Sequence, residues 1–446
     1  MPIDPTRGRA IVTYGSSLMA LTIAESLGDR GVEVIGCDDV GMTVVSFSRH
    51  ANGNFIHARA ATEPDQFIDD LEAAVIRFKP RDDRPYVLIP CFQETRLIAR
   101  HAERLSRYIT VAAPSYDAIA AVDPKDNLMR TLRRLGLRAP GTCTVAEWRA
   151  GDPARPTVFP MMVKPSWGVG GRGVRKVDNE AMLEAAIAEA EAAGESLLIQ
   201  DFVAGDDYCL TALFDRGVLK ASAAYHNLAQ YPLAAGAGVL RETVSDAPFL
   251  PEVEALFGAL EWTGVAEIDF RWDGAAAPWL VEVNPRFWAG LFHTVESGVD
   301  FPWLLYELAA TGQVLEDVHA RLGQRTKVGG LYLLSAIEGV ARSEEGFAAS
   351  RAAWATVSHR FQSGRLLEAA LDLGRATLTE GLDVSHAAGR LRDVLASARH
   401  APNELFRNAD PLVSLGALFI VASLLRYGQL PPELRYDPAG HDLTIE

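Results

Sequence analysis

The chain has 446 residues, of which 48% are hydrophobic and 23% are charged, and its formal net charge is −15. This length predicts about three domains of ordinary size, and the composition is typical of a globular protein with a sizeable core. The acidic balance argues against a nucleic-acid-binding protein, which normally carries a basic face.

The sequence contains no segment that predicts secretion or a membrane span. The N-terminus lacks a cationic head followed by an apolar core and a cleavage site. The longest apolar run, 411–425, is shorter than the roughly 20 residues that cross a bilayer. We interpret it as a buried helix, with a membrane-surface or oligomer contact as the alternative. Four scattered cysteines without metal-binding spacing indicate buried thiols in a reducing compartment, so we expect a cytoplasmic protein.

Residues 9–120 alternate apolar strand runs with helical patterns. The expected elements, in order, are a strand at 10–14, a helix at 18–28, a strand at 32–36, a helix at 67–78 and a strand at 86–90. This βαβ order predicts a parallel sheet covered by helices. The turn after the first strand could bind a dinucleotide, with Asp38 as the contact to the ribose. However, only Gly15 of the G-x-G-x-x-G pattern is present. A nicotinamide or flavin oxidoreductase is therefore the weakest alternative.

A second unit begins near Val122. We expect a helix from about Lys125 to Leu135, because the stop signals Gly136 and Pro140 follow it. The further elements expected are a helix at 179–193, strands at 196–200, 209–214 and 218–224, a helix near 251–261, and strands at 266–272 and 279–283. From about residue 312 onward the pattern is mainly helical and carries no chemical motif.

The run M-M-V-K-P-S-W-G-V-G-G-R-G-V, at 161–174, places Lys164 at the end of a strand and Arg172 in a glycine-rich turn. Backbone amides of such turns form concavities that bind anions, so the run predicts a phosphate site. The lysine precedes the glycines and no G-K-[ST] follows, so this is not a Walker loop.

Three oxygen donors lie in the next pair of apolar strands, Asp269 in the first strand and Glu282 and Asn284 in the second. Residues two apart on a strand share a face, and Asp269 can face them across the pair. Carboxylate and amide oxygens are the ligands that Mg²⁺ takes alongside phosphate oxygens, so the group predicts a metal site. The alternative is that these acids are solvated strand ends.

Together these motifs resemble the ATP-grasp superfamily. The matching runs are D-P-K at Lys125, V-K-P-S-W-G-V-G-G-R-G-V, Q-D-F-V-A-G-D-D-Y, and E-I-D-F with E-V-N-P-R-F-W, over roughly residues 9–310. E-V-N-P-R-F-W-A-G looks most like the carboxylate–amine ligase branch with D-aspartate ligase-like and carbamoyl-phosphate-synthetase-like proteins.

The resemblance implies an α/β fold, α+β in the nucleotide-binding part. A pre-ATP-grasp parallel-sheet domain would occupy residues 1–122, and an ATP-grasp domain of two α+β subdomains, about 123–198 and 199–311, would follow. The remaining residues, 312–446, would form a mainly helical C-terminal region.

The resemblance also implies contacts with ATP. The residues implied to contact the phosphates are Lys125, Lys164 and the closing loop with Gly168, Gly170, Gly171, Arg172 and Gly173. Those implied at the adenine hinge are Gln200, Asp201, Phe202 and Val203, with Asp207 on the ribose.

Metal binding and catalysis are implied for the acidic hairpin. Its three oxygen donors would hold two Mg²⁺ ions, with Mn²⁺ as a substitute, and Arg286 would steady the transferred phosphate or acyl phosphate. Glu267 stands where some amide ligases of the superfamily carry an arginine, so stabilisation of the tetrahedral intermediate would fall to Arg286 or Arg241. Lys164 and Arg172 are the further residues implied in catalysis. We expect the segment 225–243, with His226 and Arg241, to be a mobile loop over the site.

The implied activity is a two-step ligation, in which a carboxylate takes the γ-phosphate of ATP and an amine then displaces the phosphate. The partners would be small carboxylates and amines of amino-acid type; whether the chain forms a homodimer stays open. One alternative is a carboxyphosphate-forming carboxylase or carbamoyl-phosphate-type enzyme, although the chain has no duplicated half and no biotin-accepting M-K-M. The other is a non-catalytic nucleotide-binding regulator.

Overall fold

The computed structural model describes most of the first 329 residues and scattered positions beyond them. The described residues are 4–153, 155–168, 173–231, 237–315, 318–329, 331–333, 335–336, 360, 365, 368, 371, 389, 391–392, 394–396 and 398–404. The run 411–425 and most of the helical pattern predicted after residue 312 lie outside them. No helix within the described part is both long and apolar enough to cross a membrane.

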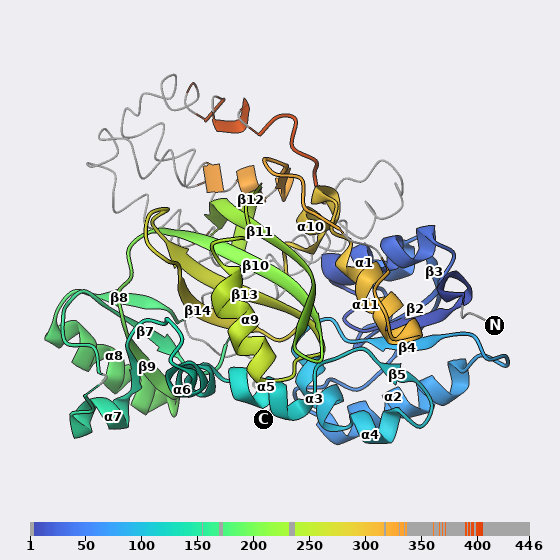
Figure 1. The fold of residues 1–446 in the computed structure, drawn as a ribbon, viewed down its shortest axis with the longest axis horizontal. Helices are drawn as coiled ribbons and strands as arrows, with labels where there is room; N and C mark the ends of the chain where they lie inside the picture. The colour runs from blue at the N-terminus through green and yellow to red at the C-terminus, as the bar shows by residue number, and fades with distance from the viewer. Residues whose placement is uncertain are drawn as a thin grey trace.

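The N-terminal part is a five-stranded parallel sheet with the strand order β3-β2-β1-β4-β5, as the βαβ pattern predicts (Figure 1). Its strands are β1 (Arg9–Val12), β2 (Glu33–Asp38), β3 (Ala51–Ile56), β4 (Tyr86–Ile89) and β5 (Thr110–Val111). Its helices are α1 (Leu18–Asp29), α2 (Pro64–Phe78), α3 (Glu94–Arg100), α4 (Ala102–Leu105) and α5 (Tyr116–Val122), with short 3₁₀ turns η1 (Pro5–Arg7) and η2 (Val45–Phe47). Just after the carboxyl ends of β1 and β4, Tyr14 and Phe92 stack with ring centroids 4.9 Å apart.

A four-stranded antiparallel sheet with the order β6-β9-β7-β8 follows, at the left of Figure 1. Its elements are α6 (Lys125–Leu135), β6 (Thr142–Thr144), α7 (Val145–Ala150), β7 (Met161–Pro165), β8 (Arg175–Val177), α8 (Glu180–Ala193) and β9 (Leu197–Asp201). Helix α6 has the predicted bounds, because Gly136 takes the left-handed conformation, with φ 68°, that ends a helix.

Helix α8 packs one apolar stripe against this small sheet. Asn179 caps its first turn by accepting from the amide of Met182, and Leu183, Ala186 and Ile187 are buried.

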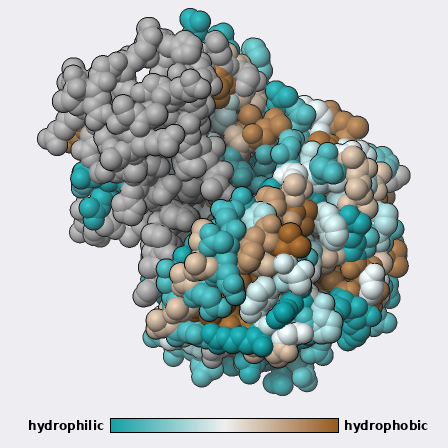
Figure 2. Space-filling view, turned by 90° about the vertical axis from the view of Figure 1, so that its left-hand side faces the viewer, coloured by the Kyte–Doolittle hydropathy of each residue, from teal (hydrophilic) through white to brown (hydrophobic). Residues whose placement is uncertain are grey.

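On the face that Figure 2 shows, hydrophobic residues of the described surface are scattered among hydrophilic ones.

The centre of the molecule is a six-stranded antiparallel sheet with the order β14-β13-β10-β11-β12-β15. Its strands are β10 (Asp206–Asp215), β11 (Val218–Tyr231), β12 (Ala237–Val244), β13 (Gly264–Trp272), β14 (Trp279–Asn284) and β15 (Arg325–Lys327), with helices α9 (Leu250–Ala259), α10 (Leu291–Ser297) and α11 (Phe301–Thr311). Strand β15 lies beyond the expected domain border at 311 but pairs with β12. The borders at 122 and 311 stay predictions.

The prediction of a mobile loop at 225–243 is wrong, because most of this segment forms the long strands β11 and β12. Residues 232–236, between the two strands, lie outside the described residues.

Alternate side chains of the central sheet face two different surroundings. Leu210, Ala212 and Phe214 pack with α5, α6 and α9, whereas Cys209 and Tyr225 lie on the opposite face, toward α10 and α11. The predicted metal ligands share this second face.

Candidate active site

Two lysines from the small sheet region meet the acidic hairpin of the central sheet. The ammonium of Lys164, on β7, donates to the carbonyl oxygen of Val281 on β14 at 3.3 Å. The ammonium of Lys125, in the first turn of α6, lies 3.1 Å from Glu282 Oε1 and donates to the carbonyl oxygen of Gly168 at 2.7 Å. Three motifs separated by up to 157 positions (282 − 125) therefore converge at one point.

Lys164 is a buried cation, 3% exposed. Its pKa is lowered to about 8, chiefly by burial; the charge of Lys125 acts in the same direction, whereas Glu282 and Asp269 oppose it. Its ammonium has too little negative charge around it to balance this burial. Such a group gains most from an anion that brings its own charge, and a phosphate is such an anion.

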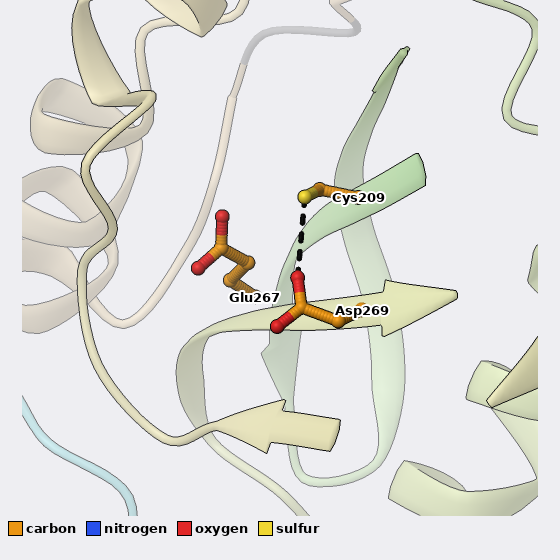
Figure 3. A group of neighbouring side chains, drawn as sticks. All are labelled: Cys209, Glu267 and Asp269. Carbon is orange, nitrogen blue, oxygen red and sulfur yellow. Dashed lines mark hydrogen bonds between the residues drawn. The ribbon is translucent and has the colours of Figure 1, made fainter. Parts of the chain in front are cut away.

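The acidic residues form one hydrogen-bonded group across β13 and β14. Asp269 pairs with Glu282 and Glu267 with Asn284 in the register of the two strands. The side-chain amide of Asn284 donates to Glu267 Oε2 and to Asp269 Oδ2, both at 3.3 Å. On β10, the thiol of Cys209 donates to Asp269 Oδ1 at 3.2 Å, as Figure 3 shows.

This group fits a divalent cation. Burial raises the pKa of Asp269 well above its usual value, and the neighbouring carboxylates of Glu267 and Glu282 raise it further. Both causes, burial of the carboxylate and the negative charge around it, would be relieved by a bound cation. Asp269, Glu282 and Asn284 supply the oxygen atoms that Mg²⁺ prefers.

A second group of possible metal ligands shares Asp269 with these three residues. One ligand atom each of Cys209, Glu267 and Asp269 lie within 4.8 Å of one another (Figure 3). Glu267 attracted notice in the sequence only as a departure from a family pattern, and Cys209 only as a scattered thiol.

Tyr225 is a site residue that the sequence did not reveal. Its hydroxyl, on β11, donates to Glu267 Oε1 at 2.6 Å, and its side chain is almost fully buried. An aromatic residue in an apolar strand is ordinary core sequence, so no local signal distinguishes it. Tyr225 fixes one oxygen of Glu267 in place.

Arg286 connects the acidic group with the N-terminal sheet. Its guanidinium donates to Asn284 Oδ1 at 3.0 Å and to the carbonyl oxygen of Phe287 at 2.8 Å. It also lies 4.4 Å from the ring centroid of Phe92, just after β4. The carboxyl edge of the parallel sheet therefore borders the acidic group.

The predicted adenine hinge is the end of β9 and the residues after it. The amide of Asp201 donates to the Gly141 carbonyl at 2.8 Å, and the side chain of Gln200 donates to Thr142 Oγ1 at 2.7 Å. Phe202 is partly exposed, beside Val203. The Gln200 side chain therefore points into the small sheet.

Two polar residues near the hinge, Asp207 and His226, contact other side chains of the sheet. Asp207, the predicted ribose contact, accepts from Arg271 at 2.6 Å and from Gln230 at 2.9 Å. His226 stacks on Tyr208, with ring centroids 4.5 Å apart, on the face of the sheet opposite to Tyr225. The side chain of His226 therefore does not face the acidic group.

Comparison with known proteins identifies this region. A family model described as the ATP-grasp domain matches residues 122–290. This part of the chain is an ATP-grasp domain. Proteins with this domain bind ATP together with Mg²⁺.

The similar proteins are ligases and carboxylases. The carbamoyl phosphate synthase large chain of Thermotoga neapolitana is 30% identical over 129 residues, which cover 28% of this chain and only 12% of that relative. L-amino acid ligase from Bacillus licheniformis has a similar fold, with a TM-score of 0.54, 16% identity, and coverage of 68% of this chain and 74% of that chain. Another similar structure is the biotin carboxylase domain of Hydrogenobacter thermophilus 2-oxoglutarate carboxylase, solved with MgADP and bicarbonate. It gives a TM-score of 0.56 and 17% identity, and the match covers 71% of this chain and 73% of that chain.

The glycine-rich loop of the ATP-grasp domain is described only at its ends. Gly168 and Gly173 have φ values of 128° and 69°, which side chains rarely adopt. Gly170, Gly171 and Arg172 lie outside the described residues. Their predicted contacts with phosphate stay predictions.

Arg241 is held in a buried ion pair with Glu404. It lies on β12, 2% exposed, and its guanidinium is 3.4 Å from a carboxylate oxygen of Glu404, which is 3% exposed. Glu404 reaches this position because Asn403 forms a parallel bridge with Lys327 of β15. The expectation that Arg241 extends from a mobile loop is wrong, and its catalytic role stays a prediction.

His293 of α10 is a neutral core residue of the same region. Its ring nitrogens lie 3.0 Å from Thr243 Oγ1 and 2.9 Å from Thr326 Oγ1, and burial, followed by the charge of Arg241, lowers its pKa to about 3. Below its ordinary pKa of 6.5, the unfolded chain gains a proton that the folded chain does not.

The free energy of unfolding should therefore fall as the pH drops from 6.5 toward 3, with a contribution from His293 of up to about 1.4 kcal/mol per pH unit. The variant His293→Gln, which keeps hydrogen-bonding groups, should lack this contribution. Denaturant unfolding of both proteins over a series of pH values measures the difference. Parallel pH dependences would show that His293 is protonated in the fold.

Proposed function

We propose that the protein is an ATP-dependent carboxylate–amine ligase that forms an amide or peptide bond through an acyl phosphate and releases ADP. The observation that carries the proposal is the convergence of Lys125 and Lys164 with Asp269, Glu282 and Asn284, beside Arg286 at the edge of the N-terminal sheet. This arrangement supports a nucleotide whose phosphates lie between the lysines and the acidic group. Its terminal phosphate would then face the N-terminal sheet.

The chemistry takes two steps. A carboxylate oxygen attacks the γ-phosphorus, the bond to the bridging oxygen of ADP breaks, and an acyl phosphate forms. The amine nitrogen then attacks the acyl carbon, the bond between that carbon and the phosphate oxygen breaks, and the nitrogen loses its extra proton to solvent. Mg²⁺ at Asp269, Glu282 and Asn284 would offset negative charge on the phosphates. The protein's own contribution is to position the reactants and neutralise charge.

Trapping with hydroxylamine tests this proposal. The protein is incubated with Mg-ATP, hydroxylamine and a panel of amino acids and dipeptides, and both hydroxamate and ADP are measured. We expect at least one carboxylate to give the two products in equal amounts. Bound nucleotide with no ADP for any carboxylate would instead support a nucleotide-binding regulator.

A second candidate is a carboxylase or carbamoyl-phosphate-type enzyme that phosphorylates bicarbonate. It is favoured by the identity to the carbamoyl phosphate synthase large chain, although the chain spans a small part of that relative. ADP formation that depends on bicarbonate and not on any amino acid would support this candidate.

Replacing Lys164 with alanine should weaken nucleotide binding about tenfold or more, because a charge-assisted hydrogen bond to phosphate contributes about 1.5–3 kcal/mol. Calorimetric titration with ADP and Mg²⁺ measures the loss. Lys220→Ala is the matched control, since Lys220 is an exposed lysine on β11. Equal affinities of the wild type and Lys164→Ala would exclude a contact between Lys164 and the phosphates.

A further inference from the structure

The site contains two opposite charges, on Glu267 and on Arg286. Within the part of the chain that the structure describes, neither the carboxylate of Glu267 nor the guanidinium of Arg286 forms an ion pair. They lie at opposite ends of one amide, since Asn284 donates to Glu267 and accepts from Arg286. A carboxylate and a guanidinium in the same site normally pair, so this separation requires a structural cause.

Glu267 is held in place by neutral donors. One oxygen accepts from the Tyr225 hydroxyl at 2.6 Å and the other from Asn284 at 3.3 Å. An ionised carboxylate can accept about four hydrogen bonds, so it retains acceptor capacity beyond these two. Glu267 is one of the partly exposed residues of β13.

A second cation, Arg241 on β12, does not pair with Glu267 either. Arg241 stands 6.0 Å from the ring of Tyr225, which itself contacts Glu267, but its guanidinium pairs with Glu404. Within the described residues the Glu267 carboxylate therefore forms no ion pair, although the charges of Arg286 and Arg241 act on it from a distance.

We propose that Glu267 binds the ammonium group of the amine substrate, an inference that rests on the proposed ligase function. A protonated primary amine offers three N–H donors and one positive charge, which complement a fixed carboxylate without a cation. Arg286, at the other end of the Asn284 amide, would hold the acyl phosphate. The amine nitrogen would then lie next to the acyl carbon, and before attack it releases one proton to solvent.

The competing role for Glu267 is that of a metal ligand. Its carboxylate belongs to the set with Cys209 and Asp269 whose ligand atoms lie within 4.8 Å of one another. The two roles differ in what Glu267→Gln would change. A metal ligand affects metal affinity and every nucleophile equally, whereas an ammonium site affects only nucleophiles that enter as cations.

The test compares an amine with hydroxylamine, which is uncharged at neutral pH, as nucleophiles for the acyl phosphate. Glu267→Gln keeps an acceptor for Tyr225. We expect it to raise the KM of the amine about 10- to 100-fold, and to slow the hydroxylamine reaction by a much smaller factor. The affinity for Mn²⁺, followed by electron paramagnetic resonance in the presence of ADP, should stay within about twofold of the wild type.

Tyr225→Phe provides a second variant, because it removes only the hydroxyl that orients Glu267, and it should raise the amine KM by a smaller factor. Glu242→Gln, on the neighbouring strand β12 and paired with Arg325 at the surface, is the control that should leave the amine KM unchanged. An unchanged amine KM in Glu267→Gln overturns the inference. Weaker Mn²⁺ binding together with equal losses for both nucleophiles overturns it in favour of a metal ligand.

The proposed function has a separate outcome. If the wild-type protein forms neither hydroxamate nor ADP with any carboxylate, the ligase proposal itself fails. If hydroxamate forms but no amine stimulates ADP release, only the assignment of an ammonium site fails.

Discussion

Replacing Glu282 with glutamine is expected to lower the rate of ADP formation about 100- to 1000-fold. Glu282 lies opposite Asp269 in the strand register, and its carboxylate is 3.1 Å from the ammonium of Lys125. The substitution removes a proposed metal ligand and also leaves a largely buried lysine without its counter-charge. Both effects act on the phosphates, so the loss should appear in kcat and in nucleotide affinity.

The measurement is a coupled ADP-release assay with a carboxylate that the wild-type protein accepts. Calorimetry with Mg²⁺ and ADP follows the affinity separately. Glu254→Gln is a suitable control, because Glu254 is an exposed residue on α9. Wild-type rates in Glu282→Gln would contradict a metal site on β14.

Replacing Glu404 with glutamine should lower the free energy of unfolding by about 3–5 kcal/mol, because it leaves the charge of Arg241 buried and unpaired. The double variant Arg241→Met, Glu404→Leu should regain most of this loss, since both charges are then absent. Denaturant unfolding followed by tryptophan fluorescence measures each difference.

The exposed pair between Glu242 and Arg325 offers a direct comparison on the same two strands. Glu242→Gln should cost less than about 1 kcal/mol, because solvent screens an exposed pair. Similar losses in Glu404→Gln and Glu242→Gln would show that the Arg241–Glu404 pair is solvated in solution.

The sequence predicted local structure well where the pattern was regular. The periodicity and stop signals of α6 gave its bounds, and the alternation in β13 and β14 placed Asp269, Glu282 and Asn284 on one face. It failed at β11 and β12, because the glycines and alanines between them resemble a loop.

The remaining features depend on contacts between residues distant in the chain. Glu404 lies 163 positions from Arg241, and no local signal connects them. In the sequence, Tyr225 is indistinguishable from an ordinary aromatic core residue. Its partner Glu267 is 42 positions away in the chain and comes into contact with it only in the folded sheet. The separation of Glu267 from a cation follows only from where Arg241 and Arg286 point, which strand periodicity does not determine.

The central claim is that the γ-phosphate of ATP is transferred to a carboxylate oxygen of the substrate. It is tested most directly by supplying a carboxylate labelled with ¹⁸O and analysing the released phosphate by mass spectrometry. An acyl-phosphate route transfers one labelled oxygen to phosphate for each amide that forms, with ADP as the nucleotide product. Phosphate without label, or AMP with pyrophosphate, would contradict the account.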